Sequence, residues 1–242
     1  MSNVTKLKSV IQSGLRSFGW EIRRFSLSEM DQLNKFLSLH KVETVLDVGA
    51  NIGQFATTLR LAGFTGRIIS FEPQSQAHAV LMKAAAADPL WDVAPRAAVG
   101  AAAGEIEMNI SNNSVSSSAL PILADHTDGA PDSRYVGVEK APVITLDDCQ
   151  LFVRDKTTFL KVDTQGFEQQ VLDGARELLK SLVGVQLEMS LAPLYEGQPD
   201  FVSLIDQMQK SGFDIWALNP GFYNRKTGRL LQADATFFRK AT

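Results

Sequence analysis

The sequence predicts a doubly wound α/β fold, in which a mostly parallel sheet carries helices on both faces and ends in an antiparallel terminal strand. Short, nearly continuous apolar runs, as at residues 43–48, are typical of strands buried on both faces of a parallel sheet. These runs alternate with stretches whose apolar residues recur with the period of a helix. Near the end of the chain, residues 213–218 and 235–238 flank a turn-rich connection, which indicates an antiparallel hairpin.

The expected elements follow in chain order. Ser28 and Asp31 form the pattern of a capping box that opens a helix through residue 39. A strand at 43–48 and a helix over about 52–62 come next, and Gly63 ends that helix. The later elements are expected at these residues: strand 67–71, helix 74–87, strand 91–99, strand 105–110, strand 158–162, helix 166–180, strand 183–189 and helix 201–211.

Residues 111–140 interrupt this alternation. They are rich in Ser, Asn, Asp, Gly and Pro and have no clear period. Connections of this length are uncommon unless they act as lids or binding segments. We therefore expect a mobile lid, with a plain surface excursion as the alternative.

One core is enough for a chain of this size. It has 242 residues, of which 45% are hydrophobic, and this supports one sizeable α/β core without a second. We expect residues 1–40 to form an N-terminal helical extension and residues 41–242 to form a single cofactor-binding domain. No internal repeat is apparent in the sequence.

Charge and cysteine content indicate which kind of partner and which cellular location to expect. A formal net charge of -3 argues against nucleic acid as the main partner, and the single Cys149, which cannot form an internal disulfide, suits a cytoplasmic location. No run approaches the ~18 apolar residues that a membrane helix requires. Basic and apolar residues interleave over residues 1–24, so this segment could make peripheral membrane contact. A surface helix packed on the domain edge is the favoured alternative.

The loop after the first strand favours one class of ligand over another. Strand, tight turn and helix together place backbone N–H groups around a small-molecule site. A dinucleotide loop would read G-x-G-x-x-G from Gly49, but Asn51 and Gln54 occupy the second and third glycine positions. Asp47 would repel a pyrophosphate and favour a ligand with an ammonium and a sulfonium, such as S-adenosylmethionine. A helix-capping or solvated carboxylate at a strand end is the alternative for Asp47, and equally for Glu72 at the end of the next apolar run.

A second acidic residue supports this interpretation. Glu72 ends the next apolar run, 25 residues after Asp47, where a carboxylate can accept hydrogen bonds from both ribose hydroxyls. Gly53 completes the pattern D-x-G-x-N-x-G that begins at Asp47. Small residues at the end of the third expected strand, among them Ala98, offer a surface against which an adenine ring could lie.

Ordered blocks of this sequence resemble the FkbM family of S-adenosylmethionine-dependent methyltransferases. The blocks are Asp47-Val-Gly-Ala-Asn-Ile-Gly53, Phe71-Glu72-Pro73, Thr145-Leu-Asp-Asp148, Lys161-Val-Asp163-Thr-Gln-Gly166-Phe-Glu168 and Leu187-Glu188. The resemblance covers about residues 43–238 and implies a Rossmann-like methyltransferase sheet with the strand order 3-2-1-4-5-7-6. Gln165 departs from the family pattern K-x-D-x-E-G-x-E, because it replaces the first glutamate. The residues expected at the cofactor are Asp47, Gly49, Ala50, Asn51, Gly53, Glu72, Pro73 and Ala98.

The ends of the fourth and fifth main parallel strands carry the expected catalytic residues. Lys161 and Asp163 share one face of a strand, and Glu188 ends the neighbouring strand. We expect Asp163 to position or accept the proton of the acceptor, with Lys161 and Glu188 as supports. A buried ion network that only orders the site is the alternative. His126 is the rival base, because an ordinary histidine titrates near neutral pH, although loop histidines are more often solvated. Asp163 and Glu188 could also hold Mg²⁺, but no third ligand is evident.

These observations predict an S-adenosylmethionine-dependent O-methyltransferase. The resemblance implies a hydroxyl acceptor, and we expect a sugar hydroxyl, such as that of a deoxyhexose on a glycolipid or a signalling oligosaccharide. Two other classes stay open. The first is a non-catalytic cofactor-binding partner subunit, which the replacement at Gln165 keeps in view. The second is an NAD-dependent oxidoreductase, which Asn51 and Asp47 disfavour.

Overall fold

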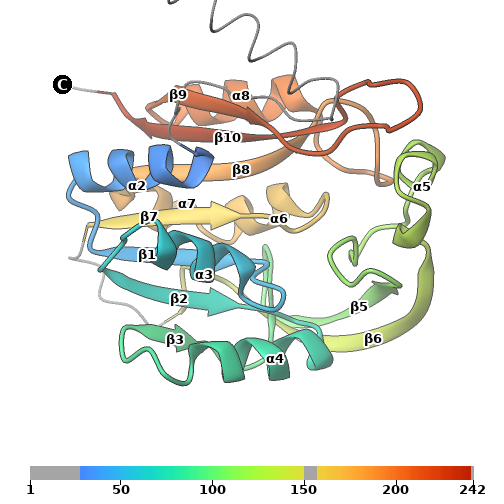
Figure 1. Ribbon diagram of the computed structural model, residues 1–242, viewed down its shortest axis with the longest axis horizontal. Coiled ribbons are helices and arrows are strands. Elements are labelled where there is room, and N and C mark those ends of the chain that lie inside the picture. The colour runs from blue at the N-terminus through green and yellow to red at the C-terminus, as the bar shows by residue number, and fades with distance from the viewer. Residues whose placement is uncertain (1–27, 150–156, 241–242) are drawn as a thin grey trace, which may run out of the picture.

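The protein is built on a seven-stranded sheet in the order β3-β2-β1-β7-β8-β10-β9. We describe a computed structural model over residues 28–149 and 157–240 (Figure 1). The strands are β1 (Thr44–Val48), β2 (Arg67–Phe71), β3 (Trp91–Val93), β7 (Thr158–Val162), β8 (Gly184–Ser190), β9 (Phe213–Pro220) and β10 (Gln232–Arg239). In this sheet β10 is antiparallel to both of its neighbours, β8 and β9, and so runs opposite to the other strands. The doubly wound sheet, its reversed terminal strand and the order implied by the family resemblance are confirmed.

Helices cover both faces of the sheet and bury a separate core on each. They are α2 (Glu29–Leu39), α3 (Gln54–Leu61), α4 (Ser75–Ala85), α6 (Glu168–Asp173), α7 (Arg176–Ser181) and α8 (Phe201–Lys210). Neighbouring residues of β1 point to opposite cores: Val45 packs in the cluster of α2, α3 and α4, and Leu46 in that of α6, α7 and α8. This is the period of two that buries a strand on both faces.

The helix before β1 starts as the sequence predicts. The Ser28 hydroxyl accepts a hydrogen bond from the Asp31 backbone N–H at 3.0 Å, and the Asp31 carboxylate accepts one from the Ser28 N–H at 3.2 Å. This reciprocal capping box fixes the N-terminus of α2. Leu33 and Leu37 of α2 are buried in the same core as β1, and the domain boundary at residue 40 stays a prediction. The basic segment at residues 1–24 lies outside the described residues.

The expected strand at residues 91–99 is wrong as a single element. It divides into β3 (Trp91–Val93) in the main sheet and β4 (Ala98–Val99) in a second sheet. The second sheet has the order β4-β6-β5 and includes β5 (Gly104–Ser111) and β6 (Tyr135–Ile144). Pro95 explains the break, since it has no N–H with which to continue the ladder along β2.

The expected helix at residues 166–180 is likewise two helices, α6 and α7, which meet at Gly174. A Cβ atom on Gly174 would lie 1.9 Å from the backbone oxygen of Gly100, so only glycine permits this close approach. The Asp147 carboxylate then accepts hydrogen bonds from the backbone N–H groups of Glu177 and Leu178, at 3.0 and 2.8 Å. A side chain from a distant segment therefore starts α7.

Residues 111–140 contain more regular structure than the sequence predicts. They include α5 (Ala124–Gly129), a 3-10 helix (Pro131–Ser133) and the first half of β6. Much of that half-strand is exposed, which explains why its sequence shows no alternation of apolar and polar residues. Residues 112–134, which we call the excursion, lie beyond the carboxyl ends of β1, β2 and β7 (Figure 1). Their mobility as a lid stays a prediction.

No helix among the described residues combines the length and apolar character needed to cross a membrane.

Candidate active site

A cavity of about 370 Å³ lies at the carboxyl edge of the sheet. The ends of β1 and β2 contribute Gly49 and Glu72 to its wall, and the second sheet contributes Ala98. The excursion closes it from the other side through Ser116 and His126. Parallel strands bring their carboxyl ends to one edge, so residues far apart in sequence meet around this cavity.

The turn after β1 needs its special residues for backbone geometry. Gly49 has φ 78°, and a Cβ atom there would lie 1.8 Å from the backbone oxygen of Asp163. Asn51, in place of the second glycine of a dinucleotide loop, has φ 48°, a conformation that asparagine tolerates better than most residues. Gly53 packs against Leu81 and Trp91, where a Cβ atom would lie 2.9 Å from each side chain. Gly49 and Gly53 thus serve close packing within the protein.

Glu72 is the buried acid of the cofactor half of the cavity. Its Oε2 accepts a hydrogen bond from the Asn51 N–H at 2.7 Å, and its Oε1 accepts one from the Gln74 N–H at 2.8 Å. Burial raises the pKa of this carboxyl to about 7, although both hydrogen bonds act in the opposite direction. Each oxygen keeps a lone pair for a further donor. The carboxyl is therefore held in place, with acceptor capacity left for a ligand's hydroxyls.

The wall beside Glu72 is apolar, as packing of a nucleobase requires. Phe71, Pro73, Ala98 and Val99 line the cavity there. A paired acceptor next to an apolar wall suits a nucleoside, whose ribose hydroxyls donate and whose base packs. Ala50 is buried and faces a neighbouring cavity of about 250 Å³ on the other side of the turn. Contacts of these residues with a cofactor stay predictions.

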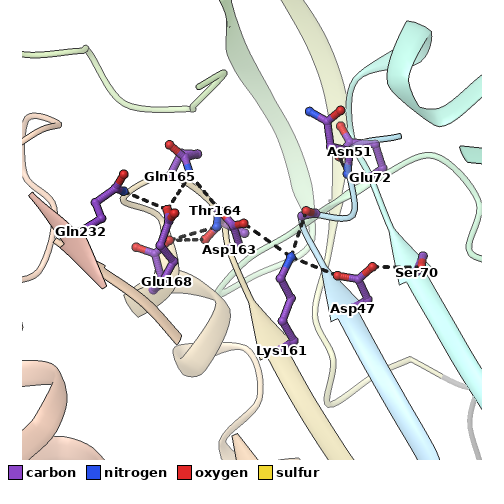
Figure 2. Close-up of polar contacts among 12 residues, drawn as sticks. Asp47, Asn51, Ser70, Glu72, Lys161, Asp163, Thr164, Gln165, Glu168 and Gln232 are labelled. Atoms are coloured by element: carbon purple, nitrogen blue, oxygen red, sulfur yellow. Dashed lines mark hydrogen bonds and ion pairs between the residues drawn. The ribbon is translucent and has the colours of Figure 1, made fainter. Parts of the chain in front are cut away.

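Asp47 and Lys161 form a buried ion pair below the turn. Lys161 Nζ lies 3.1 Å from Asp47 Oδ1 and donates to the Gly49 backbone oxygen at 3.3 Å (Figure 2). The Ser70 hydroxyl donates to the other oxygen of Asp47 at 3.3 Å. Burial alone would lower the pKa of Lys161, but the carboxylates of Asp47 and Asp163 outweigh it and hold that pKa above its ordinary value. Asp47 is fully buried and lines neither cavity, so in this structure it neutralises Lys161.

Asp163 and Glu188 meet at the cavity, as the strand ends predict. Both line its wall, and Gln165 lies between them. Its Nε2 donates to Asp163 Oδ1 at 2.8 Å and to Glu188 Oε2 at 2.5 Å, and Gln232 Nε2 donates to Glu188 Oε2 at 2.8 Å (Figure 2). Burial first, and then the charge of Asp163, raise the pKa of Glu188 well above its ordinary range. The site thus holds two close carboxyl groups bridged by amide donors.

Glu168 fixes the turn that carries this pair. Its Oε1 accepts hydrogen bonds from the Thr164 N–H at 3.0 Å, the Thr164 hydroxyl at 3.1 Å and the Gly166 N–H at 3.2 Å. Burial raises the pKa of Glu168 to about 7. Gln165 has φ 55° inside this turn, a strained conformation for a residue with a side chain. In this conformation the amide of Gln165 contacts both carboxyl groups.

His126 is not the solvated loop residue that the sequence suggests. Its side chain is 3% exposed, with Nδ1 3.0 Å from the Ser133 hydroxyl and Nε2 3.0 Å from the Tyr195 hydroxyl.

Tyr195 and Gln232 join the site without any signal in the sequence. Tyr195 lies in a connection without periodicity, and both residues reach the site from elements distant in the chain.

The expectation of Mg²⁺ finds no support. The residues described, 28–149 and 157–240, contain no group of three or more His, Cys, Asp or Glu side chains that could hold a metal ion. The oxygens of Asp163 and Glu188 that face each other are occupied by the Gln165 amide hydrogens.

Comparisons with known proteins give one family match and several distant solved structures. Residues 47–215 match the family model of the methyltransferase FkbM domain, whereas no curated protein sequence matches the chain. Similar solved structures include magnesium protoporphyrin IX methyltransferase (ChlM) from Synechocystis PCC 6803 with bound SAM. It is 11% identical to this chain, with 96% of this chain and 97% of that chain covered and a TM-score of 0.46. The ribosomal protein L11 methylase from Lactobacillus delbrueckii subsp. bulgaricus is 13% identical, covers 92% and 83%, and has a TM-score of 0.44.

A third structure, Sp1610 from Streptococcus pneumoniae in complex with S-adenosyl-L-methionine, is 12% identical, with 90% of this chain and 75% of that chain covered and a TM-score of 0.48. Likenesses this distant say nothing about the acceptor. The family match is different in kind, because it spans more than half of the chain and begins at Asp47, the first residue of the turn motif. The chain therefore belongs to the FkbM family of S-adenosylmethionine-dependent methyltransferases.

Proposed function

We propose that this methyltransferase transfers the methyl group to a hydroxyl oxygen, and that the acceptor is a sugar, such as a deoxyhexose on a glycolipid or a signalling oligosaccharide. The observation that carries the proposal is the pair of carboxyl groups, Asp163 and Glu188, at the wall of the cavity. A hydroxyl must lose its proton when its oxygen is methylated, and a carboxylate within reach can accept that proton.

The acceptor end of the cavity has the mixed character that a sugar requires. Phe222 offers an aromatic ring, and Arg225, Gln232 and Glu188 offer donors and acceptors. A sugar presents C–H groups that pack on an aromatic ring and hydroxyls that bind polar side chains. This combination favours a saccharide over a purely apolar acceptor.

Each residue of the site then has a role in the transfer. S-adenosylmethionine, when bound beside Glu72, supplies a methyl group activated by its sulfonium. Asp163 orients the acceptor hydroxyl and takes its proton as the new C–O bond forms. Lys161 Nζ, 3.6 Å from Asp163 Oδ2, holds that carboxylate in place from below. Glu188 shares the amide donors with Asp163 and shapes the local charge.

A label-transfer experiment tests the proposal. The purified protein is incubated with S-adenosylmethionine carrying a ¹³C-methyl group and with deoxyhexose glycosides, free and lipid-linked. We expect NMR to detect a labelled methyl ether on the sugar. A label that appears on nitrogen or carbon of a different acceptor, with none on any glycoside, would contradict the proposal.

Glu72 makes cofactor binding sensitive to pH. With a pKa of about 7, this carboxyl is ionised above neutral pH and protonated below it. Only the ionised form accepts hydrogens from both ribose hydroxyls, so the affinity for S-adenosylmethionine is expected to fall as the pH drops from about 8 to about 6. Calorimetric titration measures this change.

Glu72→Gln should weaken binding roughly 10- to 150-fold near the higher pH and flatten the pH dependence. Wild-type affinity in a folded Glu72→Gln protein would refute the assignment.

A further inference from the structure

A continuous chain of hydrogen bonds joins the excursion to the two carboxyl groups. His126 Nε2 lies 3.0 Å from the Tyr195 hydroxyl, and that hydroxyl lies 2.7 Å from Gln165 Oε1. The other end of the Gln165 amide contacts Asp163 and Glu188. His126 and Tyr195 are 3% and 1% exposed, so bulk water does not supply alternative partners.

The direction of every hydrogen in this chain follows from the carboxyl groups. Ionised carboxylates only accept, so both amide hydrogens of Gln165 point toward Asp163 and Glu188, and its Oε1 faces Tyr195. A flipped amide would set Oε1 against two carboxyl oxygens, and a single proton on Glu188 could relieve only one of these contacts. The hydroxyl of Tyr195 therefore donates to Gln165 at 2.7 Å, in preference to the Ser116 backbone oxygen at 3.3 Å.

Counting the available hydrogens in the same way also assigns the proton of the His126 imidazole. The one hydrogen of the Tyr195 hydroxyl is used toward Gln165, so its oxygen must accept from His126 Nε2–H. Burial lowers the pKa of His126, which keeps the ring neutral with one hydrogen near neutral pH. That hydrogen is on Nε2, so Nδ1 accepts from the Ser133 hydroxyl at 3.0 Å. The same hydroxyl lies 2.6 Å from the Ala130 backbone oxygen, so Nδ1 and that carbonyl compete for its single hydrogen. Both ring nitrogens of His126 are taken up by Ser133 and Tyr195, which argues against His126 as the rival base.

Resting on the proposed function, we propose that Tyr195 and His126 are positioning residues. They hold the Gln165 amide so that its two hydrogens point to Asp163 and Glu188. This keeps Asp163 in its proton-accepting form. Donors aimed at a carboxylate favour its charged form, and hydrogen bonds in a chain strengthen one another. The Ser118 hydroxyl, which donates to the Gln165 backbone oxygen at 2.7 Å, holds the same turn.

This arrangement gives a physical reason why glutamine, and not the glutamate of the family pattern, stands at Gln165. A glutamate there would bring a third carboxyl group within about 3 Å of two others, an arrangement in which they cannot all ionise. The amide instead supplies two hydrogens to the pair and one acceptor to Tyr195. Gln165→Glu should therefore need an additional bound proton to reach the active arrangement.

The kinetic test compares two tyrosines that each lose one hydroxyl. Tyr195→Phe should lower kcat about tenfold, leave the affinity for S-adenosylmethionine unchanged and move the acidic limb of the pH–rate profile to higher pH, because the carboxyl pair loses its locked donors. Gln165→Glu should move that limb the same way. The other charged groups facing the pair are Lys161, Glu168 and Asp234, and all remain in these variants. Tyr135→Phe, which loses a 2.6 Å bond to the Leu120 backbone oxygen, is the matched control and should not move the limb.

A second measurement needs no turnover. The chain has three histidines, so ¹⁵N-histidine NMR of the cofactor-free protein, with His126→Gln to assign the signal, reads the tautomer directly. We expect Nε2–H on His126, with its hydrogen slow to exchange in the wild type and fast in Tyr195→Phe. An Nδ1–H tautomer, or an unmoved pH limb in folded Tyr195→Phe, would overturn the proposal. Failure of the O-methyl assignment is a separate outcome, because it appears as a misplaced ¹³C label and leaves the tautomer as expected.

Discussion

Replacing Asp163 with asparagine is expected to lower turnover by about 10²–10⁴-fold, the usual effect of losing a general base. The amide cannot take a proton from the acceptor hydroxyl, but it keeps an oxygen that accepts the bond from Gln165. Glu72 and the apolar wall are unchanged in this variant, so the affinity for S-adenosylmethionine is expected to stay within a few-fold of wild type. Single-turnover label transfer and calorimetry on the same preparation separate the two quantities.

A matched control for Asp163→Asn is available on the surface. Asp206 is exposed on α8, pairs with Lys210 at 2.7 Å and is not among the residues that line the cavity, so Asp206→Asn should leave turnover unchanged. Near-normal turnover in folded Asp163→Asn would mean that the proton leaves by another route. Glu188, whose raised pKa suits a proton carrier, would then be the first residue to test.

The largest effect on stability is expected at Lys161. Its ammonium neutralises Asp47, which is fully buried. Lys161→Met leaves that carboxylate without a cation, and breaking a buried pair in this way costs roughly 3–5 kcal/mol of the free energy of unfolding. Urea unfolding monitored by circular dichroism measures the loss.

Two further variants isolate the cause of that loss. Asp47→Asn combined with Lys161→Met removes the fully buried carboxylate together with its cation and should recover most of the stability, because Asp163, the other partner of Lys161, has a side chain that is 34% exposed. Lys180→Met breaks an exposed pair with Glu177 at 2.6 Å and should change the stability by at most about 1 kcal/mol. A double variant as unstable as Lys161→Met would show that packing of the lysine stem, and not charge, is what matters.

The sequence was sufficient for the parts of the fold that depend on local pattern. Strands β1, β2, β7 and β8 are buried on both faces, and such runs stand out against amphipathic helices. The capping box at Ser28 and the Gly63 stop after α3 are also local signals, and the structure confirms both. The strand order came from the family resemblance, since periodicity carries no information on which strands pair.

The errors arose where distant segments decide the local structure. Nothing near Gly174 in sequence indicates that Gly100 approaches it, and the Asp147 cap on α7 comes from a different connection. The half of β6 at Tyr135 is paired mainly through its backbone with β5, and its exposed side chains leave no pattern. Tertiary contacts overrode local preference in each case.

The candidate site likewise contains parts that the local sequence predicts and parts that only the tertiary structure reveals. Asp163 and Glu188 could be placed together because strand ends meet at one edge of a parallel sheet. Asp47 was correctly placed at the end of β1, but its partner Lys161 comes from the neighbouring strand and draws it away from the cavity. The chain from His126 through Tyr195 to Gln165 joins side chains that are tens of residues apart, and only the three-dimensional fold reveals it.

The most direct test of the account is a calorimetric titration of the purified wild-type protein near neutral pH, first with S-adenosylmethionine and then, separately, with NAD. The turn at Gly49 to Gly53, the acid at Glu72 and the apolar wall at Ala98 together predict one-site binding of S-adenosylmethionine and no binding of NAD. Binding of NAD, or no heat of binding with S-adenosylmethionine in a folded protein, would contradict the account.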